Sequence, residues 1–158
     1  MTTIQLANVD ARLAYLALQY HLARPGSELD PLTKQPGPHG LAEVARSLEP
    51  QLERAVATIE LADQQRQRLV SAIAGAINEL KSSPLLASGG RTMVPAFQET
   101  LRRLFPETAD DPDEATQLAG HLLALRRRLE QIELAPAGAG EEPAPSRRWW
   151  RFWERTGT

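Results

Sequence analysis

Apolar residues follow an unbroken rhythm of steps of four and three through the middle of the chain. The positions are Leu41, Ala45, Leu48, Leu52, Ala55, Ile59, Ala62, Arg66, Leu69, Ile73, Ala76 and Leu80. This is the a/d spacing of a heptad repeat, which is typical of coiled coils and helical bundles. The rhythm predicts one amphipathic helix of about 40 residues, which would be about 60 Å long at the helical rise per residue.

Pro50 interrupts this predicted helix. Proline removes one backbone hydrogen bond and clashes with the carbonyl group four residues earlier. Either the helix kinks there, or a short helix ends and a new one begins at the proline. The apolar spacing keeps its phase from Leu48 to Leu52, which favours the kink.

Three shorter helices are expected around the long one. Apolar stripes predict them at residues 3–23, 94–105 and 112–134, the last with Asp111 as its N-cap. Residues 24–40 contain four prolines and predict a long connection that Leu29 and Leu32 pin to the core. The expected fold is therefore an all-α bundle of about four helices, organised on the long, Pro50-kinked helix.

The chain divides by composition into three parts. Residues 1–134 carry the apolar periodicity and are expected to form the helical bundle domain. Residues 135–146 are rich in Pro, Ala and Gly, a composition typical of a linker that cannot build a core. Residues 147–158 form a Trp/Arg tail, which we expect to be flexible until it binds something.

The Trp/Arg tail is the strongest candidate for a functional segment. All three tryptophans of the protein lie within five consecutive positions of it. On a helical wheel its aromatic residues occupy one side and its arginines the other, which is typical of a short interfacial anchor. The candidate binding residues are Arg147, Arg148, Trp149, Trp150, Arg151, Phe152, Trp153 and Arg155.

Four kinds of target match the composition of the tail. A membrane surface is favoured because tryptophan prefers the headgroup level and arginine is attracted to anionic lipid. Docking into a groove on a partner protein is nearly as well supported, since Trp and Arg are typical hot-spot residues. The tail could instead cover its own bundle, or stack on nucleic-acid bases.

The long stripe also predicts self-association. Each shorter helix would cover only part of a rod about 60 Å long. Either the first helix packs along one half and the third and fourth along the other, or two copies pair through the rod. The continuous stripe favours pairing, most simply as a dimer. The residues expected to form this oligomerisation and core stripe are Leu48, Leu52, Ile59, Arg66, Leu69, Ile73 and Leu80. Arg66 is a polar residue within the stripe and could fix its register, although an exposed polar waist is the simpler interpretation.

No residue pattern indicates catalysis, a metal or a cofactor. The chain has no cysteine, and neither its histidines nor its acidic cluster at 110–114 has a known ligand spacing. No basic residues precede an apolar run at the N-terminus, so no signal peptide is predicted. The net charge of −2 gives no global attraction to nucleic acid.

We therefore expect a non-catalytic scaffold or adaptor that self-associates and presents its tail to a membrane surface or a protein partner. It would be cytoplasmic, with peripheral membrane attachment as an option. The basic residues are 16 Arg and 2 Lys, a bias that suggests a bacterial source. The alternative is a helical subunit of a nucleoprotein complex, with Arg126, Arg127 and Arg128 on the phosphates and the tail on the bases.

Overall fold

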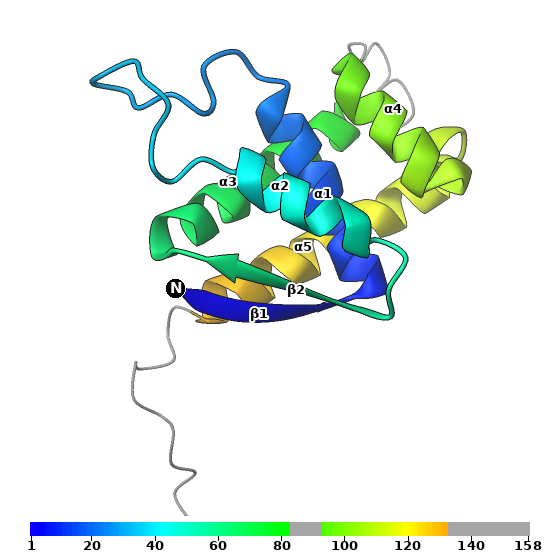
Figure 1. Cartoon of the computed structure of the whole chain (residues 1–158). Helices are drawn as coiled ribbons and strands as arrows, with labels where there is room; N and C mark the ends of the chain where they lie inside the picture. Colours follow the sequence, from blue (N-terminus) through cyan, green and yellow to red (C-terminus); the bar gives the residue numbers. More distant parts are fainter. Residues whose placement is uncertain (83–92, 133–158) are drawn as a thin grey trace, which may run out of the picture.

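In the computed structural model, the described residues are 1–82 and 93–132, and they form five α-helices and a two-stranded antiparallel sheet (Figure 1). The strands are β1 (Thr2–Ala7) and β2 (Val56–Leu61). The helices are α1 (Asn8–Leu22), α2 (Ala42–Leu48), α3 (Asp63–Lys81), α4 (Pro95–Leu104) and α5 (Pro112–Gln131). Two short 3-10 helices, η1 (Glu49–Gln51) and η2 (Pro106–Ala109), follow α2 and α4.

The predicted helix of about 40 residues is wrong. Residues 41–80 are divided among α2, η1, β2 and α3, and the longest helix in the described part of the chain is α5, with 20 residues. Helix α2 ends just before Pro50, which lies in the 3-10 helix η1, so the expected kink within a continuous helix is not present. Residues 56–61 then alternate exposed and buried side chains, with Ala57, Ile59 and Leu61 buried. Ile59 fits the heptad spacing as well as the alternating spacing of a strand. The heptad pattern therefore continued through residues that form a strand in the structure.

The prediction of an all-α fold is also wrong at the N-terminus. The helix expected from residue 3 begins only at Asn8, and residues 2–7 form β1. Ile4 and Leu6 are buried and their neighbours are more exposed, which is the alternation of a half-buried strand. Ile4 lies opposite Ile59, and Leu6 lies opposite Ala57. These cross-strand apolar pairs turn one face of the ribbon towards the helices.

Helix α1 lies at the centre of the molecule. It packs against α2, α3, α4 and α5, and Leu13, Leu16 and Leu18 on different sides of it are almost completely buried. A helix that is apolar nearly all round is expected in such a position. α1 approaches α3 closely, because a Cβ atom added to Gly75 would lie only 2.3 Å from Cε1 of Tyr20.

The long connection at residues 24–40 is held by Glu28 rather than by leucines. Leu32 is 92% exposed and Leu29 is 38% exposed, so the expectation that both pin the loop to the core is wrong. The Glu28 carboxylate instead accepts a hydrogen bond from the N–H of Ala42 at 3.0 Å and contacts Nε2 of His21 at 2.8 Å. One carboxylate thus joins the end of α1 to the start of α2.

The start of α5 agrees with the sequence. Asp111 caps the helix by accepting hydrogen bonds from the N–H groups of Asp113 and Glu114, and Pro112 occupies the first turn. At the start of α4, the buried carboxylate of Glu79 accepts a hydrogen bond from the N–H of Val94 at 2.6 Å. Polar side chains therefore fix the ends of both helices.

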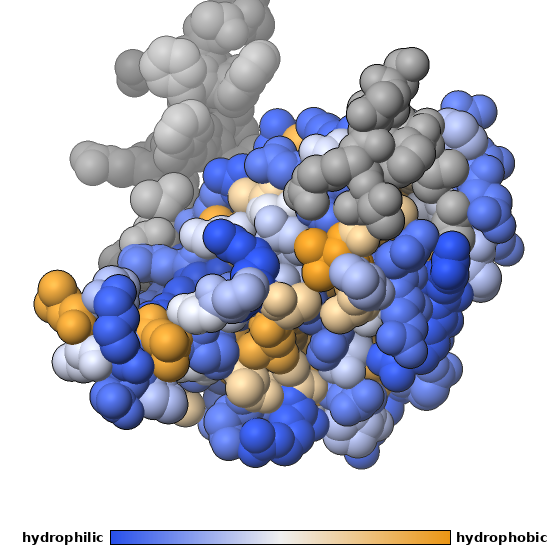
Figure 2. Space-filling view, turned by 90° about the horizontal axis from the view of Figure 1, so that it is seen from above, coloured by the Kyte–Doolittle hydropathy of each residue, from blue (hydrophilic) through white to orange (hydrophobic). Residues whose placement is uncertain are grey.

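The surface carries apolar residues in separate groups. Figure 2 shows one such group near the centre of the face seen from above and others at the left of the view, each bordered by hydrophilic residues. The large apolar side chains that are exposed among the described residues belong to different elements: Met1, Val9, Leu29, Leu32, Val56 and Leu123. Scattered exposure of this kind is usual for a folded protein surface.

Candidate functional site

The seven residues of the predicted oligomerisation and core stripe lie inside a single chain. They are distributed over α2, β2, α3 and the turn after η1, and none is more than 5% exposed. The stripe residues are Leu48, Leu52, Ile59, Arg66, Leu69, Ile73 and Leu80. Self-association remains a prediction, but a continuous long helix cannot supply its surface, because that helix is not present.

Arg66 is buried, so the favoured interpretation of residues 63–68 as an exposed polar waist is wrong at this position. It is 3% exposed, and its Nη1 donates a hydrogen bond of 3.2 Å to the carbonyl oxygen of Leu129. The last carbonyl groups of a helix lack partners within the helix and attract cations. Arg66 on α3 therefore stabilises the C-terminal end of α5.

The Trp/Arg tail and its linker lie outside the described residues, so its eight candidate binding residues stay a prediction. Their point of attachment is described, because the tail follows the end of α5 in the chain. That end is tied to the domain twice, by Arg66 and by an ion pair of 2.5 Å between Arg128 and Asp10 of α1. Whatever the tail binds is thereby connected to a well-anchored helix.

The arginine run at 126–128 is largely occupied by carboxylates. Arg126 pairs with Glu130 at 2.8 Å, and Arg128 pairs with Asp10. An arginine neutralised in this way is a poor phosphate ligand unless the ion pair breaks first. The run therefore gives little support to the alternative of a nucleoprotein subunit.

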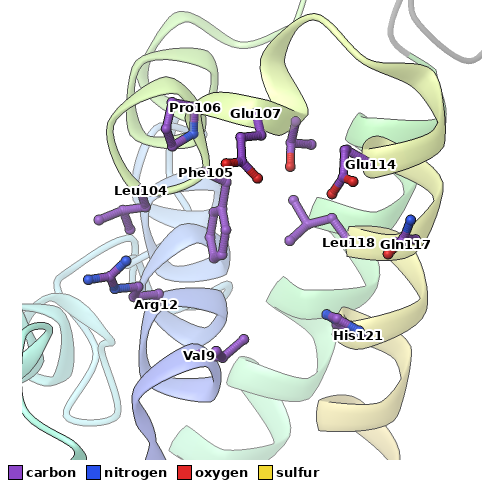
Figure 3. A pocket seen from close by; sticks show the side chains of 11 residues that line it. Val9, Arg12, Leu104, Phe105, Pro106, Glu107, Glu114, Gln117, Leu118 and His121 are labelled. Atoms are coloured by element: carbon purple, nitrogen blue, oxygen red, sulfur yellow. The ribbon is translucent and has the colours of Figure 1, made fainter.

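A hollow lies between the start of α1, the turn from α4 into η2, and α5 (Figure 3). Its volume is about 380 Å³. In Figure 3, Phe105 and Leu118 reach into it from opposite walls and Val9 lies at its lower end. Val9 is 49% exposed, so the apolar floor is accessible from solvent.

The polar rim of the hollow does not form a catalytic arrangement. Arg12 is held by Glu53 through two contacts of 3.1 Å. His121 and Glu114 stand on one face of α5, and within the described part of the chain His121 has no hydrogen bond to a carboxylate. A general base is normally oriented by such a partner. Among the described residues, the hollow thus combines an apolar floor with a rim whose histidine has no carboxylate partner.

Among the histidines, His21 is the one with a carboxylate partner, which lies seven residues along the chain at Glu28. Burial alone would raise the pKa of the Glu28 carboxyl, but the N–H groups of Leu41 and Ala42 and the His21 ring outweigh it, so this pKa lies below its ordinary value. Within residues 1–82 and 93–132, no three His, Cys, Asp or Glu side chains come together as a metal site. The pair is a structural clasp for the 24–40 loop.

A second groove runs between α3 and α5. Its volume is about 600 Å³, and its walls include Ile77, Ala119, Gly120 and Leu123. No heavy atom lies within 4 Å of the position that a Cβ would take on Gly120. The groove is apolar and open, and nothing in the structure shows what would cover it.

The two edges of the β-ribbon differ, and sequence reasoning missed both. The outer edge of β2 is covered by Gln51, whose side-chain amide accepts from the Thr58 N–H and donates to the Thr58 carbonyl, each at 3.0 Å. The outer edge of β1 has no such cover: no hydrogen bond reaches the backbone of Thr3 or Gln5 from that side among the residues described. In Figure 1, β1 forms the lower margin of the described structure. The alternation of Ile4 and Leu6 was the sequence signal for this strand.

No helix in the described part of the chain is both long and apolar enough to cross a membrane. Comparison with known protein families, characterised proteins and solved structures gives no match.

Proposed function

We propose that this protein is a non-catalytic scaffold or adaptor that self-associates and presents its Trp/Arg tail to a membrane surface. The single observation that carries the proposal is the tail itself. Three tryptophans, a phenylalanine and four arginines lie within residues 147–155, joined to the domain by a linker of low complexity. Docking of the same tail on a protein partner is the competing outcome, and vesicle binding distinguishes the two.

The physical case for a membrane surface rests on two additive terms. Indole rings are favoured at the headgroup level of a bilayer, and each arginine near an anionic surface contributes about 1 kcal/mol. Such a short segment binds reversibly when it is alone, and two copies in one particle bind more tightly by avidity. A peripheral location at the cytoplasmic face of a membrane belongs to this proposal.

The domain fits the role of a base for the tail. Arg66 and the ion pair between Arg128 and Asp10 hold the end of α5, from which the chain continues towards the tail. The hollow beside Phe105 offers an apolar floor without an oriented acid–base pair, which supports binding rather than catalysis. Neither feature identifies the target of the tail.

Co-sedimentation with vesicles tests the proposal. The full chain is mixed with neutral phosphatidylcholine vesicles and with vesicles that contain anionic phosphatidylglycerol. We expect binding to the anionic vesicles, loss of most of it when Trp149, Trp150 and Trp153 are replaced by alanine, and a weaker dependence on anionic lipid when the tail arginines become glutamine. Absence of binding at millimolar anionic lipid would refute the membrane role and favour docking of the tail on a protein surface, its own bundle included, or on nucleic acid.

A further inference from the structure

The backbone groups of β1 that point away from β2 can be identified from two hydrogen bonds. In an antiparallel pair, the N–H and C=O of one residue point to the same side, and the side alternates along the strand. Thr58 directs both groups to Gln51, so its cross-strand partner Gln5 directs both of its own groups outwards. The N–H of Asn8 donates to the carbonyl oxygen of Ala55 at 3.0 Å, so the backbone groups of Asn8 point towards the β2 side. Asn8 lies three residues after Gln5, and because the direction alternates along the strand, this bond independently places the groups of Gln5 on the outer side.

Within residues 1–82 and 93–132, the open edge of β1 has none of the usual devices against unwanted pairing. Exposed strand edges are normally blunted by charges, proline or a bulge, or are covered by another segment. The strand Thr-Thr-Ile-Gln-Leu-Ala contains neither a charge nor a proline, and its register with β2 runs without a bulge. The opposite edge of the same ribbon is covered by Gln51, so the two edges differ in protection.

We propose that a second copy of this chain pairs with the open edge of β1, strand against strand and antiparallel, to form a four-stranded sheet across a two-fold axis. This inference rests on the self-association in the proposed function, and it identifies the edge of β1 as the surface through which two copies associate. The outward groups of β1 lie at Thr3, Gln5 and Ala7. When Gln5 faces the second copy's Gln5, Thr3 faces the second copy's Ala7, so every outward N–H and C=O in the strand finds a partner.

The same register keeps the faces of the sheet aligned. Ile4 would lie opposite the second copy's Leu6, and both side chains stay on the face that packs against the helices. On the solvent face, the side chains of Thr3, Gln5 and Ala7 from the two copies would lie side by side. None of these residues is charged, so the two strands would not repel each other there. A C2 interface needs this kind of self-complementary surface, whereas an unrelated strand would have no reason to match it.

The area involved sets the expected strength. Stable interfaces bury about 1,200–2,000 Å² in total, and pairing of one six-residue strand supplies less. We therefore expect a dimer that dissociates on dilution, with a dissociation constant in the micromolar range or above. Two chains in one particle would carry two tails and bind vesicles with higher avidity.

Charge variants at the two-fold position provide the test. Gln5→Lys places two ammonium groups opposite each other in the dimer, and Gln5→Glu places two carboxylates there. Gln5 is exposed on the solvent face, so both variants should fold. The matched control is Thr58→Lys, which adds the same charge on the neighbouring strand, on the same face and opposite Gln5, but away from the axis.

Analytical ultracentrifugation of the full chains over a range of concentrations gives the result. We expect the wild type and Thr58→Lys to dimerise alike, and each Gln5 variant to dimerise at least about tenfold more weakly. An equimolar mixture of Gln5→Lys and Gln5→Glu should recover dimers. A monomeric wild type at several hundred micromolar, or a Gln5→Lys variant that associates like the wild type, would overturn the proposal. Vesicle binding by the monomeric Gln5→Lys chain tests the tail separately, so failure of one proposal is distinguishable from failure of the other.

Discussion

The side-chain amide of Gln51 forms two hydrogen bonds of 3.0 Å with the backbone of Thr58, in the arrangement that a neighbouring strand would supply. Nε2 of Gln51 also lies 2.9 Å from the carbonyl oxygen of Ser47, within the last turn of α2. A single glutamine after Pro50 therefore connects the helix end to the ribbon. It also closes one edge of the sheet, which has two strands in the part of the chain that the structure describes.

Replacing Gln51 by alanine should destabilise the fold and expose the edge of β2. Loss of two side-chain hydrogen bonds is expected to lower the free energy of unfolding by about 1–2 kcal/mol. The amide of Thr58 should then exchange faster with solvent deuterium. Urea denaturation and hydrogen exchange measure both effects. Gln64→Ala, the same truncation at an exposed position of α3, should change neither, and equal behaviour of the two variants would refute this role of Gln51.

Two helical glycines should respond oppositely to alanine. At Gly75 the new Cβ would lie 2.3 Å from the Tyr20 ring, whereas at Gly120 it would meet no atom within 4 Å. Gly120→Ala should raise the unfolding free energy by about 0.5–1 kcal/mol, the gain in helix propensity. Gly75→Ala should lower it by about 1–3 kcal/mol through overpacking. Thermal unfolding of the two variants and the wild type measures both changes. A Gly75→Ala protein more stable than the wild type would show that α1 and α3 are not in close contact at this position.

The Glu28 clasp should make stability depend on acid pH. Its pKa in the folded protein lies below the ordinary value of 4.5, so the folded state favours the ionised carboxylate. The stabilisation is present above pH 4.5 and is lost as the pH falls through the lowered pKa. Glu28→Gln should reduce stability at pH 7 by about 1–2 kcal/mol and flatten the acid side of the profile. The exposed Glu43→Gln, with a side chain 81% exposed, should leave the profile unchanged; a profile in Glu28→Gln as steep as in the wild type would contradict the clasp.

Replacing the buried Arg66 should lower the free energy of unfolding more than replacing an exposed arginine does. Arg66→Met keeps much of the side-chain volume but removes a buried donor from the carbonyl of Leu129, and we expect a loss of about 1–3 kcal/mol. The amides of the last turn of α5 should lose protection from hydrogen exchange before those of its first turn. Arg127→Met, which changes an exposed residue of α5, serves as the control. Uniform loss of protection along α5 would argue against a local role at its C-terminal end.

Part of this fold could be predicted from the sequence. The helical nature of most of the chain, the start of α5 at Asp111 and Pro112, and the burial of the middle helix positions follow from capping and periodicity. The two strands were missed because each is only six residues long. Ile59 belongs to a heptad pattern as well as to an alternating one, and local spacing does not choose between them. The choice depends on the pairing of β1 with β2, a contact between residues 49 to 59 positions apart in the chain.

The candidate site shows the same division. The tail is evident from its composition, because three tryptophans in five positions are conspicuous in any sequence. The contact of Arg66 with Leu129 and the cover that Gln51 gives to Thr58 join residues whose proximity arises only on folding. Nothing in the local sequence distinguishes Gln51 from Gln64, although only the first is placed beside a strand edge.

Hydrogen exchange at Gln5 and Thr58, followed as a function of protein concentration, tests the unequal edges of the ribbon most directly. These two residues face each other across the sheet, so each serves as the internal reference for the other. We predict that the Thr58 amide is protected at every concentration, while the Gln5 amide exchanges freely in dilute protein and becomes protected as the protein is concentrated. A Gln5 amide that stays unprotected at several hundred micromolar, or a Thr58 amide that exchanges freely, would contradict this account.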